Sequence, residues 1–197
     1  MKIVFASNNK NKYRELNALI KQLSIELILQ SDSGIDEIEE TGLTFVENAL
    51  NKARHASRMA GLPAIADDSG LAVAALNGAP GIYSARYAGD YATSESNINK
   101  LLIELKDIPD KHREAYFYCV LVCLLDERDP MPLICEGKWQ GRILHQAKGN
   151  KGFGYDPIFY IPSKRKTAAE LSLAIKNKIS HRGIALQMLM HRLVEKL

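Results

Sequence analysis

The sequence contains no long apolar run, and none approaches the about 20 residues that a membrane-spanning helix requires. Its opening, MKIVFA, is too short to be the apolar region of a signal peptide. Lys and Arg exceed Asp and Glu only slightly, 26 against 23, which does not indicate a nucleic-acid-binding surface. We therefore expect a cytoplasmic protein that forms no stable complex with nucleic acid and does not enter the membrane.

Cysteine is also scarce, and the three present, Cys119, Cys123 and Cys135, do not have the spacing of a zinc site. Cys119 and Cys123 fall in the apolar run 115–125 and are separated by an even number of residues. On a strand both side chains would face the same way. We expect buried structural thiols rather than reactive ones.

No internal repeat, low-complexity tract or linker divides the chain, so residues 1–197 are expected to form one domain. Apolar periodicity predicts strands at 2–6, 25–29, 64–66, 115–126 and 133–139. It predicts helices at 10–23, after Thr44, after Thr93 and after Ser180, with Thr44 and Glu47 matching a capping box. Alternating strands and helices indicate an α/β fold.

The first candidate site is the polar turn Ser7-Asn8-Asn9-Lys10-Asn11-Lys12 between a predicted strand and a predicted helix. Unpaired N–H groups and a partial positive charge at a helix N-terminus bind phosphate. The turn lacks the glycines and the final Lys-Ser/Thr of a P-loop. Taken alone, it favours an ordinary capped helix with solvated lysines.

The second candidate site is acidic and combines Glu39-Glu40, in a polar loop, with Asp67-Asp68 after an apolar run. Magnesium takes oxygen ligands, commonly one or two carboxylates completed by water and substrate phosphates. A solvated turn capped by Asp explains the second pair equally well. Because its two acids are contiguous, the pair does not fit the Asp-x-Asp pattern of haloacid-type phosphatases.

The third candidate is the glycine-rich segment Gly152-Phe153-Gly154-Tyr155-Asp156-Pro157. Glycines allow the backbone to approach a ligand closely, and an aromatic face can stack on a nucleobase. Asp156 could accept a hydrogen bond from a purine N–H. An ordinary loop with Phe153 in the core is at least as consistent with this segment alone.

The fourth candidate combines Lys176 with Ser180-His181-Arg182. In it, His181 and Arg182 are donors that suit a keto oxygen or a phosphate. A His-Arg pair at a helix start is more often a surface feature.

Together these segments resemble one family, the non-canonical purine nucleoside triphosphate pyrophosphatases, and its bacterial members most closely. The matching segments, in order, are 7–12, 40–49, 66–71, 80–89, 152–157 and 180–182. One departure is Asn8, where many members have glycine, which puts the geometry of that turn in question.

The resemblance implies an α/β fold with an elongated mixed central sheet, flanking helices and two lobes with a cleft between them, assembled as a homodimer. It implies that Glu40 and Asp68 hold Mg²⁺ and that Asp68 is the general base. The residues it implies for substrate binding are Ser7, Asn8, Asn9, Lys10, Asn11, Lys12, Lys52, Ser69, Phe153, Gly154, Tyr155, Asp156, Lys176, His181 and Arg182.

The implied reaction is hydrolysis of ITP, dITP and XTP to the monophosphate and pyrophosphate, which removes deaminated purines from the nucleotide pool. Two other readings remain open. One is a related pyrophosphatase that acts on pyrimidine nucleotides, and the other is a nucleotide-sensing module that binds without cutting. Glu40 and Asp68 favour an enzyme over a sensor.

Overall fold

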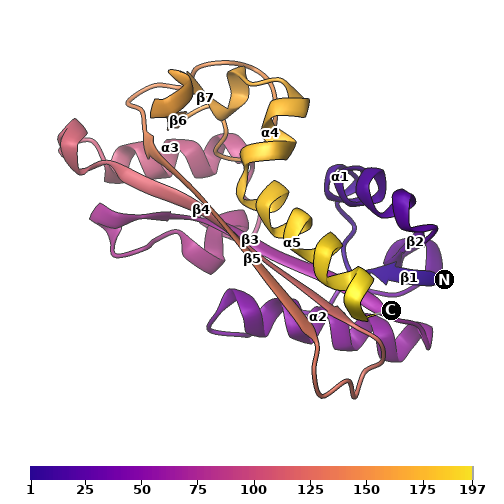
Figure 1. Cartoon of the computed structure of the whole chain (residues 1–197). Coiled ribbons are helices and arrows are strands. Elements are labelled where there is room, and N and C mark those ends of the chain that lie inside the picture. The colour runs from indigo at the N-terminus through magenta and orange to yellow at the C-terminus, as the bar shows by residue number, and fades with distance from the viewer. Residues whose placement is uncertain (197) are drawn as a thin grey trace. The chain divides into compact units, whose positions relative to one another are not determined.

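The computed structural model describes residues 1–196 (Figure 1). Its strands are β1 (Lys2–Phe5), β2 (Glu26–Leu29), β3 (Ala64–Val73), β4 (Glu114–Leu124), β5 (Leu133–Ile143), β6 (Phe159–Ile161) and β7 (Lys166–Thr167). Its α-helices are α1 (Lys10–Ile20), α2 (Phe45–Ala60), α3 (Ser94–Glu104), α4 (Leu173–Ile179) and α5 (His181–Lys196). Within these residues no helix is both long and apolar enough to cross a membrane.

The described strands form one seven-stranded sheet in the order β2-β1-β3-β4-β5-β6-β7. β1 pairs in parallel with both β2 and β3, so that Val4 lies opposite Ile28 on one side and Ala64 on the other. β6 pairs antiparallel with both β5 and β7. The sheet is therefore mixed and carries flanking helices, which confirms the predicted α/β class.

The chain forms two compact units. Unit 1 comprises Met1–Asp68, Cys119–Gly137 and Arg182–Leu197, and unit 2 comprises Ser69–Tyr118 and Lys138–His181. Each unit has its own cluster of buried apolar side chains. Strands β3, β4 and β5 contribute residues to both units.

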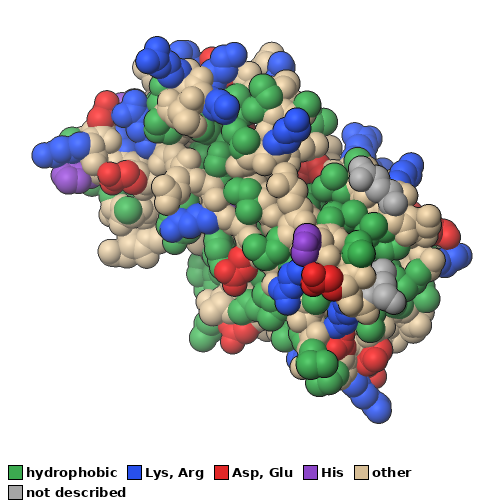
Figure 2. Space-filling model, in the orientation of Figure 1, with side chains coloured by type: hydrophobic (Ala, Val, Ile, Leu, Met, Phe, Trp, Pro, Cys, Tyr) green, Lys and Arg blue, Asp and Glu red, His purple; other side chains and the backbone are tan. Residues whose placement is uncertain are grey.

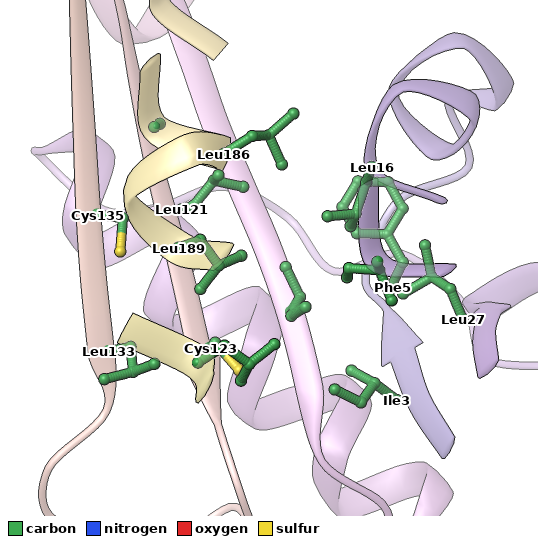
Figure 3. Packing of buried hydrophobic residues seen from close by; sticks show 14 of the residues in the cluster. Ile3, Phe5, Leu16, Leu27, Leu121, Cys123, Leu133, Cys135, Leu186 and Leu189 are labelled. Carbon is green, nitrogen blue, oxygen red and sulfur yellow. The ribbon is translucent and has the colours of Figure 1, made fainter. Parts of the chain in front are cut away.

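The core of unit 1 joins its strands to two helices. Figure 3 shows Phe5 of β1 near Leu16 of α1, and Leu186 and Leu189 of α5 beside β4 and β5. Full burial of a leucine side chain stabilises the fold by about 1.5–3 kcal/mol relative to exposure. The apolar spacing of α1 and α5 therefore serves to cover the sheet.

The three cysteines lie in this same core as free, buried thiols. Cys119 and Cys123 both face it, as the even spacing predicts. Burial raises the pKa of the Cys123 thiol to about 12, because the thiolate would lose its hydration. The prediction of structural rather than reactive thiols is consistent with this environment.

Helix α2 begins as predicted, because the Thr44 hydroxyl accepts a hydrogen bond from the Glu47 N–H at 3.2 Å. The other half of the predicted capping box is wrong. The Glu47 carboxylate accepts from the Leu43 N–H at 2.9 Å and from the Thr44 hydroxyl, rather than from the Thr44 N–H. The Leu43 N–H lies one residue earlier, so the carboxylate ties the approaching loop to the helix.

The core of unit 2 is built around aromatic rings. The Phe117 ring lies 4.5 Å from Phe159, and Trp139 lies 5.2 Å from Phe159, both in tilted arrangements. Such pairs contribute about 0.5–1.5 kcal/mol beyond the apolar area that they bury. They connect β4, β5 and β6 on one face of this part of the sheet.

A fully buried arginine closes one end of unit 2. Arg113 donates to the carbonyl oxygens of Leu105, Ile108, Ile143 and Leu144, at 2.5, 3.3, 2.9 and 3.0 Å. These carbonyls belong to the segment that follows α3 and to the end of β5. The guanidinium therefore links two segments distant in the sequence.

Arg113→Ala should lower the free energy of unfolding by about 3–5 kcal/mol, because buried carbonyl groups lose their donors and a cavity forms. Chemical denaturation monitored by circular dichroism measures this loss. Lys111→Ala, at an exposed position two residues earlier, is the matched control and should change stability by less than about 0.5 kcal/mol. Equal stability of the two variants would contradict the linking role.

Candidate active site

The acid pair Asp67-Asp68 lies inside a continuous strand. β3 runs from Ala64 to Val73, so the predicted end of the strand at Ala66 is wrong. Both carboxylates are almost fully buried, with Asp67 1% and Asp68 5% exposed. Unpaired carboxylates are costly to bury, and nearby donors offset that cost in this strand.

Asp67 is held by two cations. Its Oδ2 lies 2.8 Å from the Lys12 ammonium and 3.5 Å from the Arg182 guanidinium. Burial alone would raise the pKa of Asp67, but Lys12, Arg182 and Lys52 together hold it well below its usual range. Asp67 is therefore a permanent anion that gathers positive charge at this point of the sheet.

Asp68 has a different environment. Its Oδ2 accepts a hydrogen bond from the side-chain amide of Asn48 at 3.1 Å. Burial raises the pKa of Asp68 to about 6, with a further contribution from Glu40, while Lys52 and the Asn48 bond oppose the rise. With this raised pKa, the Asp68 carboxylate is a better base than an exposed aspartate and remains largely ionised at neutral pH.

Glu40 and Lys52 form an ion pair, with the Lys52 ammonium 2.5 Å from Glu40 Oε1. Burial lowers the pKa of Lys52, yet the charges of Asp67, Asp68 and Glu40 outweigh burial and leave it raised. Asn48, one turn before Lys52 on α2, donates to Asp68 Oδ2 at 3.1 Å, so the same helix contacts both acids. The charge of Glu40 raises the pKa of both Lys52 and Asp68, in keeping with this placement. The structure thus brings together the two predicted metal ligands in unit 1.

A magnesium ion fits this donor set. Within residues 1–196, no three His, Cys, Asp or Glu side chains form a ready-made metal cluster. Glu40 and Asp68 nevertheless provide the two carboxylates that Mg²⁺ commonly takes from a protein when water and substrate phosphates complete its shell. A cation between them would also offset the mutual repulsion of the two acids.

The turn before α1 is an ordinary helix cap in its local geometry. The Asn9 side chain accepts from the N–H groups of Asn11 and Lys12 at 3.0 and 3.1 Å, and the Ser7 hydroxyl accepts from the Asn9 N–H. These bonds occupy N–H groups that could otherwise bind phosphate. The Lys12 side chain, which reaches Asp67, is the member of this segment that the structure joins to the acid pair.

Asn8, the departure from the family pattern, causes no backbone strain, because it is not among the residues with positive φ. Its side-chain oxygen accepts from the Gln30 amide at 3.4 Å, and its N–H donates to Glu37. Lys10 and Asn11 are exposed. Their side chains are available to an approaching polyanion.

Arg182 lies with this acid–lysine set in unit 1. Its guanidinium bonds Glu15 at 3.0 Å in addition to Asp67. Burial would lower the pKa of Arg182, but the negative charges of Asp67 and Glu15 outweigh burial and raise the pKa above its usual value. The guanidinium charge is therefore permanent. Sequence reasoning missed Glu15, which follows Lys12 by three residues and so shares a face of α1 with it.

In unit 2, the loop of residues 152–156 is organised by Asp156, which is 3% exposed. Its Oδ2 accepts from the Phe153 N–H at 2.9 Å and from the Lys176 ammonium in a short contact. The Lys176 ammonium lies 4.9 Å from the centre of the Phe153 ring. The predicted residues Phe153, Asp156 and Lys176 are therefore brought together as one contact group.

The other predicted unit 2 residues occupy supporting positions. Tyr155 is buried, and its hydroxyl donates to the Ser84 carbonyl at 2.9 Å. The His181 ring stacks on Phe117 with centroids 4.8 Å apart. Ser69 is half-buried on β3, and Gly154 has a φ of 58° that lets the loop turn. Tyr155 belongs to the apolar core of unit 2, and His181 stacks on two of its rings, Phe117 and Trp139.

Lysine and arginine side chains gather over the region of β6, β7 and α4 in Figure 2. The exposed basic residues in this part of unit 2 are Lys148, Lys151, Lys164, Arg165, Lys166 and Lys178. The sequence from 138 to 181 contains acids only at Asp156 and Glu170. The resulting positive potential attracts polyanions.

Comparison with known proteins shows which family the chain belongs to. The model of the Ham1 family matches residues 3–192. The chain belongs to the Ham1 family. It is 57% identical to the dITP/XTP pyrophosphatase of Salmonella paratyphi A and 55% identical to that of Escherichia coli K12, in each case over 98% of both chains. The resemblance noted from the sequence motifs is thereby confirmed.

Solved structures of Ham1 proteins have the same fold. A HAM1 protein from Coxiella burnetii superimposes with a TM-score of 0.94 at 52% identity, covering 99% of both chains. The Ham1 protein of Staphylococcus aureus gives 0.90 at 41% identity, covering both chains fully.

Gly152→Ala should disrupt the loop of this Ham1 protein. Gly152 has a φ of 76°, and an added Cβ would lie 2.0 Å from Asp156 Oδ2, which is already fixed by Phe153 and Lys176. We expect a lower free energy of unfolding and weaker nucleotide binding, measured by denaturation and by calorimetry.

The matched control is Gly154→Ala, where φ is 58° but nothing lies within 4 Å of an added Cβ. Gly154→Ala should lower the free energy of unfolding only by the cost of placing alanine in a left-handed backbone conformation, about 1–2 kcal/mol. If both variants bound nucleotide equally well, the Asp156 contact would not be organising the loop.

Proposed function

We propose that this chain hydrolyses the non-canonical purine nucleoside triphosphates dITP, ITP and XTP to the monophosphate and pyrophosphate. It would thereby keep deaminated purines out of DNA and RNA. The observation that carries the proposal is the acid–lysine set in unit 1, where Lys52 pairs with Glu40, the buried Asp68 responds to both of their charges, and Lys12 binds the buried Asp67. The names of the relatives at 55–57% identity support it.

The set suits attack on a phosphoryl group. A water oxygen bonds to the α-phosphorus, the bond to the bridging oxygen breaks, and pyrophosphate leaves with that electron pair. Asp68 accepts the proton of the attacking water. Lys12 and Lys52 would offset part of the triphosphate charge, because catalysis in phosphoryl transfer consists mainly of positioning and charge stabilisation.

Magnesium is part of the proposal, with Glu40 and Asp68 as its protein ligands. When bound, it would acidify the attacking water and neutralise phosphate charge. We further propose a cytoplasmic homodimer, on the basis of the family that the motifs resemble.

In unit 2, the Phe153 ring would stack on the base. Hypoxanthine and xanthine present a keto oxygen at C6 and a protonated N1, for which the ammonium of Lys176 and the carboxylate of Asp156 are a donor and an acceptor. Adenine instead has an amino donor at C6 and an acceptor at N1, so neither group of the protein would be matched. Sites that bind a substrate by such hydrogen bonds reject an analogue that cannot form them by about 10⁴-fold or more. His181 stacks on Phe117 in the core of unit 2 and would support the base-binding loop from there. Arg182 instead pairs with Asp67 and Glu15, so we place it with the acid–lysine set of unit 1.

Product analysis tests the proposal. With dITP, ITP or XTP and Mg²⁺, the products should be the monophosphate and pyrophosphate, and a chelator should abolish turnover because two carboxylates would be left without their cation. ATP, dTTP and UTP should react far more slowly. Preference for a pyrimidine nucleotide would favour the related pyrimidine pyrophosphatase, binding without products would favour a sensor, and orthophosphate as first product would contradict attack at the α-phosphorus.

Asp68→Asn should abolish turnover of dITP while nucleotide binding persists, because the amide cannot accept the proton. Steady-state kinetics and calorimetric titration measure the two properties separately. Asp36→Asn, at an exposed acid of the same unit, is the control and should remain active. Full activity of the Asp68 variant would refute the proposed base.

A further inference from the structure

Helix α2 carries a buried polar side chain that the proposed reaction does not yet use. Asn48 is 1% exposed, in a helix whose Ala49, Ala53 and Ala56 are fully buried. A carboxamide in such a position costs stability unless its donors and acceptor are bonded. In this chain its two ends bind two different parts of the candidate active site.

The carboxamide oxygen accepts a hydrogen bond from the Gly42 N–H at 2.8 Å. The nitrogen donates to Asp68 Oδ2 at 3.1 Å. These partners fix the orientation of the amide, since an N–H requires an acceptor and a carboxylate requires a donor. Asn48 therefore links the loop that carries Glu40 to the strand that carries Asp68.

The contact with the loop leaves no room for another side chain. A Cβ added at Gly42 would lie 2.6 Å from Asn48 Oδ1 and 2.8 Å from the Glu47 Cβ. Glycine at position 42 thus allows the backbone to approach the carboxamide closely. One turn later on the same face of α2, Lys52 bonds Glu40, so the helix holds both proposed metal ligands.

We propose that Asn48 is a positioning residue for the reaction, fixing the Asp68 carboxylate in its working orientation through Oδ2 and setting its place relative to Glu40 through Gly42. The inference rests on the proposed function, because it assigns Asn48 no chemistry of its own. An aspartate side chain has two rotatable bonds, and a misplacement of about 1 Å at a reacting group can reduce a rate by about 10²-fold.

Two substitutions separate this role from simple support of the loop. Asn48→Ala removes both hydrogen bonds. Asn48→Asp retains an acceptor for the Gly42 N–H but loses the donor to Asp68 and places a like charge beside it. Assays at about pH 9 keep ordinary carboxyl groups ionised.

Ser57→Ala is the matched control. Ser57 is a buried polar residue of the same helix, and its hydroxyl donates to the Leu62 carbonyl at 2.7 Å. This control loses a buried hydrogen bond without touching the active site. It should lower the thermal midpoint while leaving kcat for dITP within about twofold of wild type.

Asn48→Ala should lower kcat for dITP by about 10- to 100-fold with KM changed little, and Asn48→Asp should be at least as slow. Calorimetry on the metal-free protein should show Asn48→Ala binding dITP with affinity close to wild type.

The inference is overturned if both variants keep kcat near that of Ser57→Ala. It is also overturned if Asn48→Asp is substantially faster than Asn48→Ala, because support of the Gly42 loop would then be sufficient. Failure of the proposed function is a distinct result: the wild-type protein would release no pyrophosphate from any purine triphosphate, and the inference would fall with it.

Discussion

The carboxylates of Asp67 and Asp68 are adjacent in a buried strand, and their negative charges must be compensated by donors or cations. Several elements of unit 1 supply this compensation. The two acidic side chains point to opposite faces of β3, so each needs its own compensation. Asp67 obtains it mainly from Lys12 of α1 and Arg182 of α5, and Asp68 obtains it from Lys52 and Asn48 of α2. Three helices are thus tied to one point of the sheet by charge and hydrogen bonding as well as by apolar packing.

This division explains how neighbouring acids differ in character. The cations beside Asp67 hold its pKa far below the usual range, whereas burial raises that of Asp68. Environments that separate the pKa values of paired acids are typical of catalytic sites. In our account Asp67 is structural and gathers cations, and Asp68 performs the chemistry. In unit 2, Asp156 acts as Asp67 does, organising Lys176 and the Phe153 loop.

Much of the fold was predictable, because regular apolar spacing marks most of the strands and the long helices. The short elements β6, β7 and α4 were missed, since they contain too few residues to show a period. The continuation of β3 through Asp67 was also missed, because it depends on cations from distant segments. The motifs supplied the candidate site residues, whereas Glu15, the partner of Arg182, is visible only in the fold. Asn48 lies in the matching segment 40–49, but its link between Gly42 and Asp68 depends on contacts that only the fold shows.

The most direct test of this account is a crystal structure of the wild-type protein with Mn²⁺ and an α,β-imido analogue of dITP, which resists hydrolysis. Anomalous scattering would locate the cation independently of any assumed ligand. We predict a Mn²⁺ peak bonded to carboxylate oxygens of Glu40 and Asp68, with the analogue's phosphates beside Lys12 and Lys52. A cation bound elsewhere, with these carboxylates contacting neither metal nor phosphate, would contradict the account.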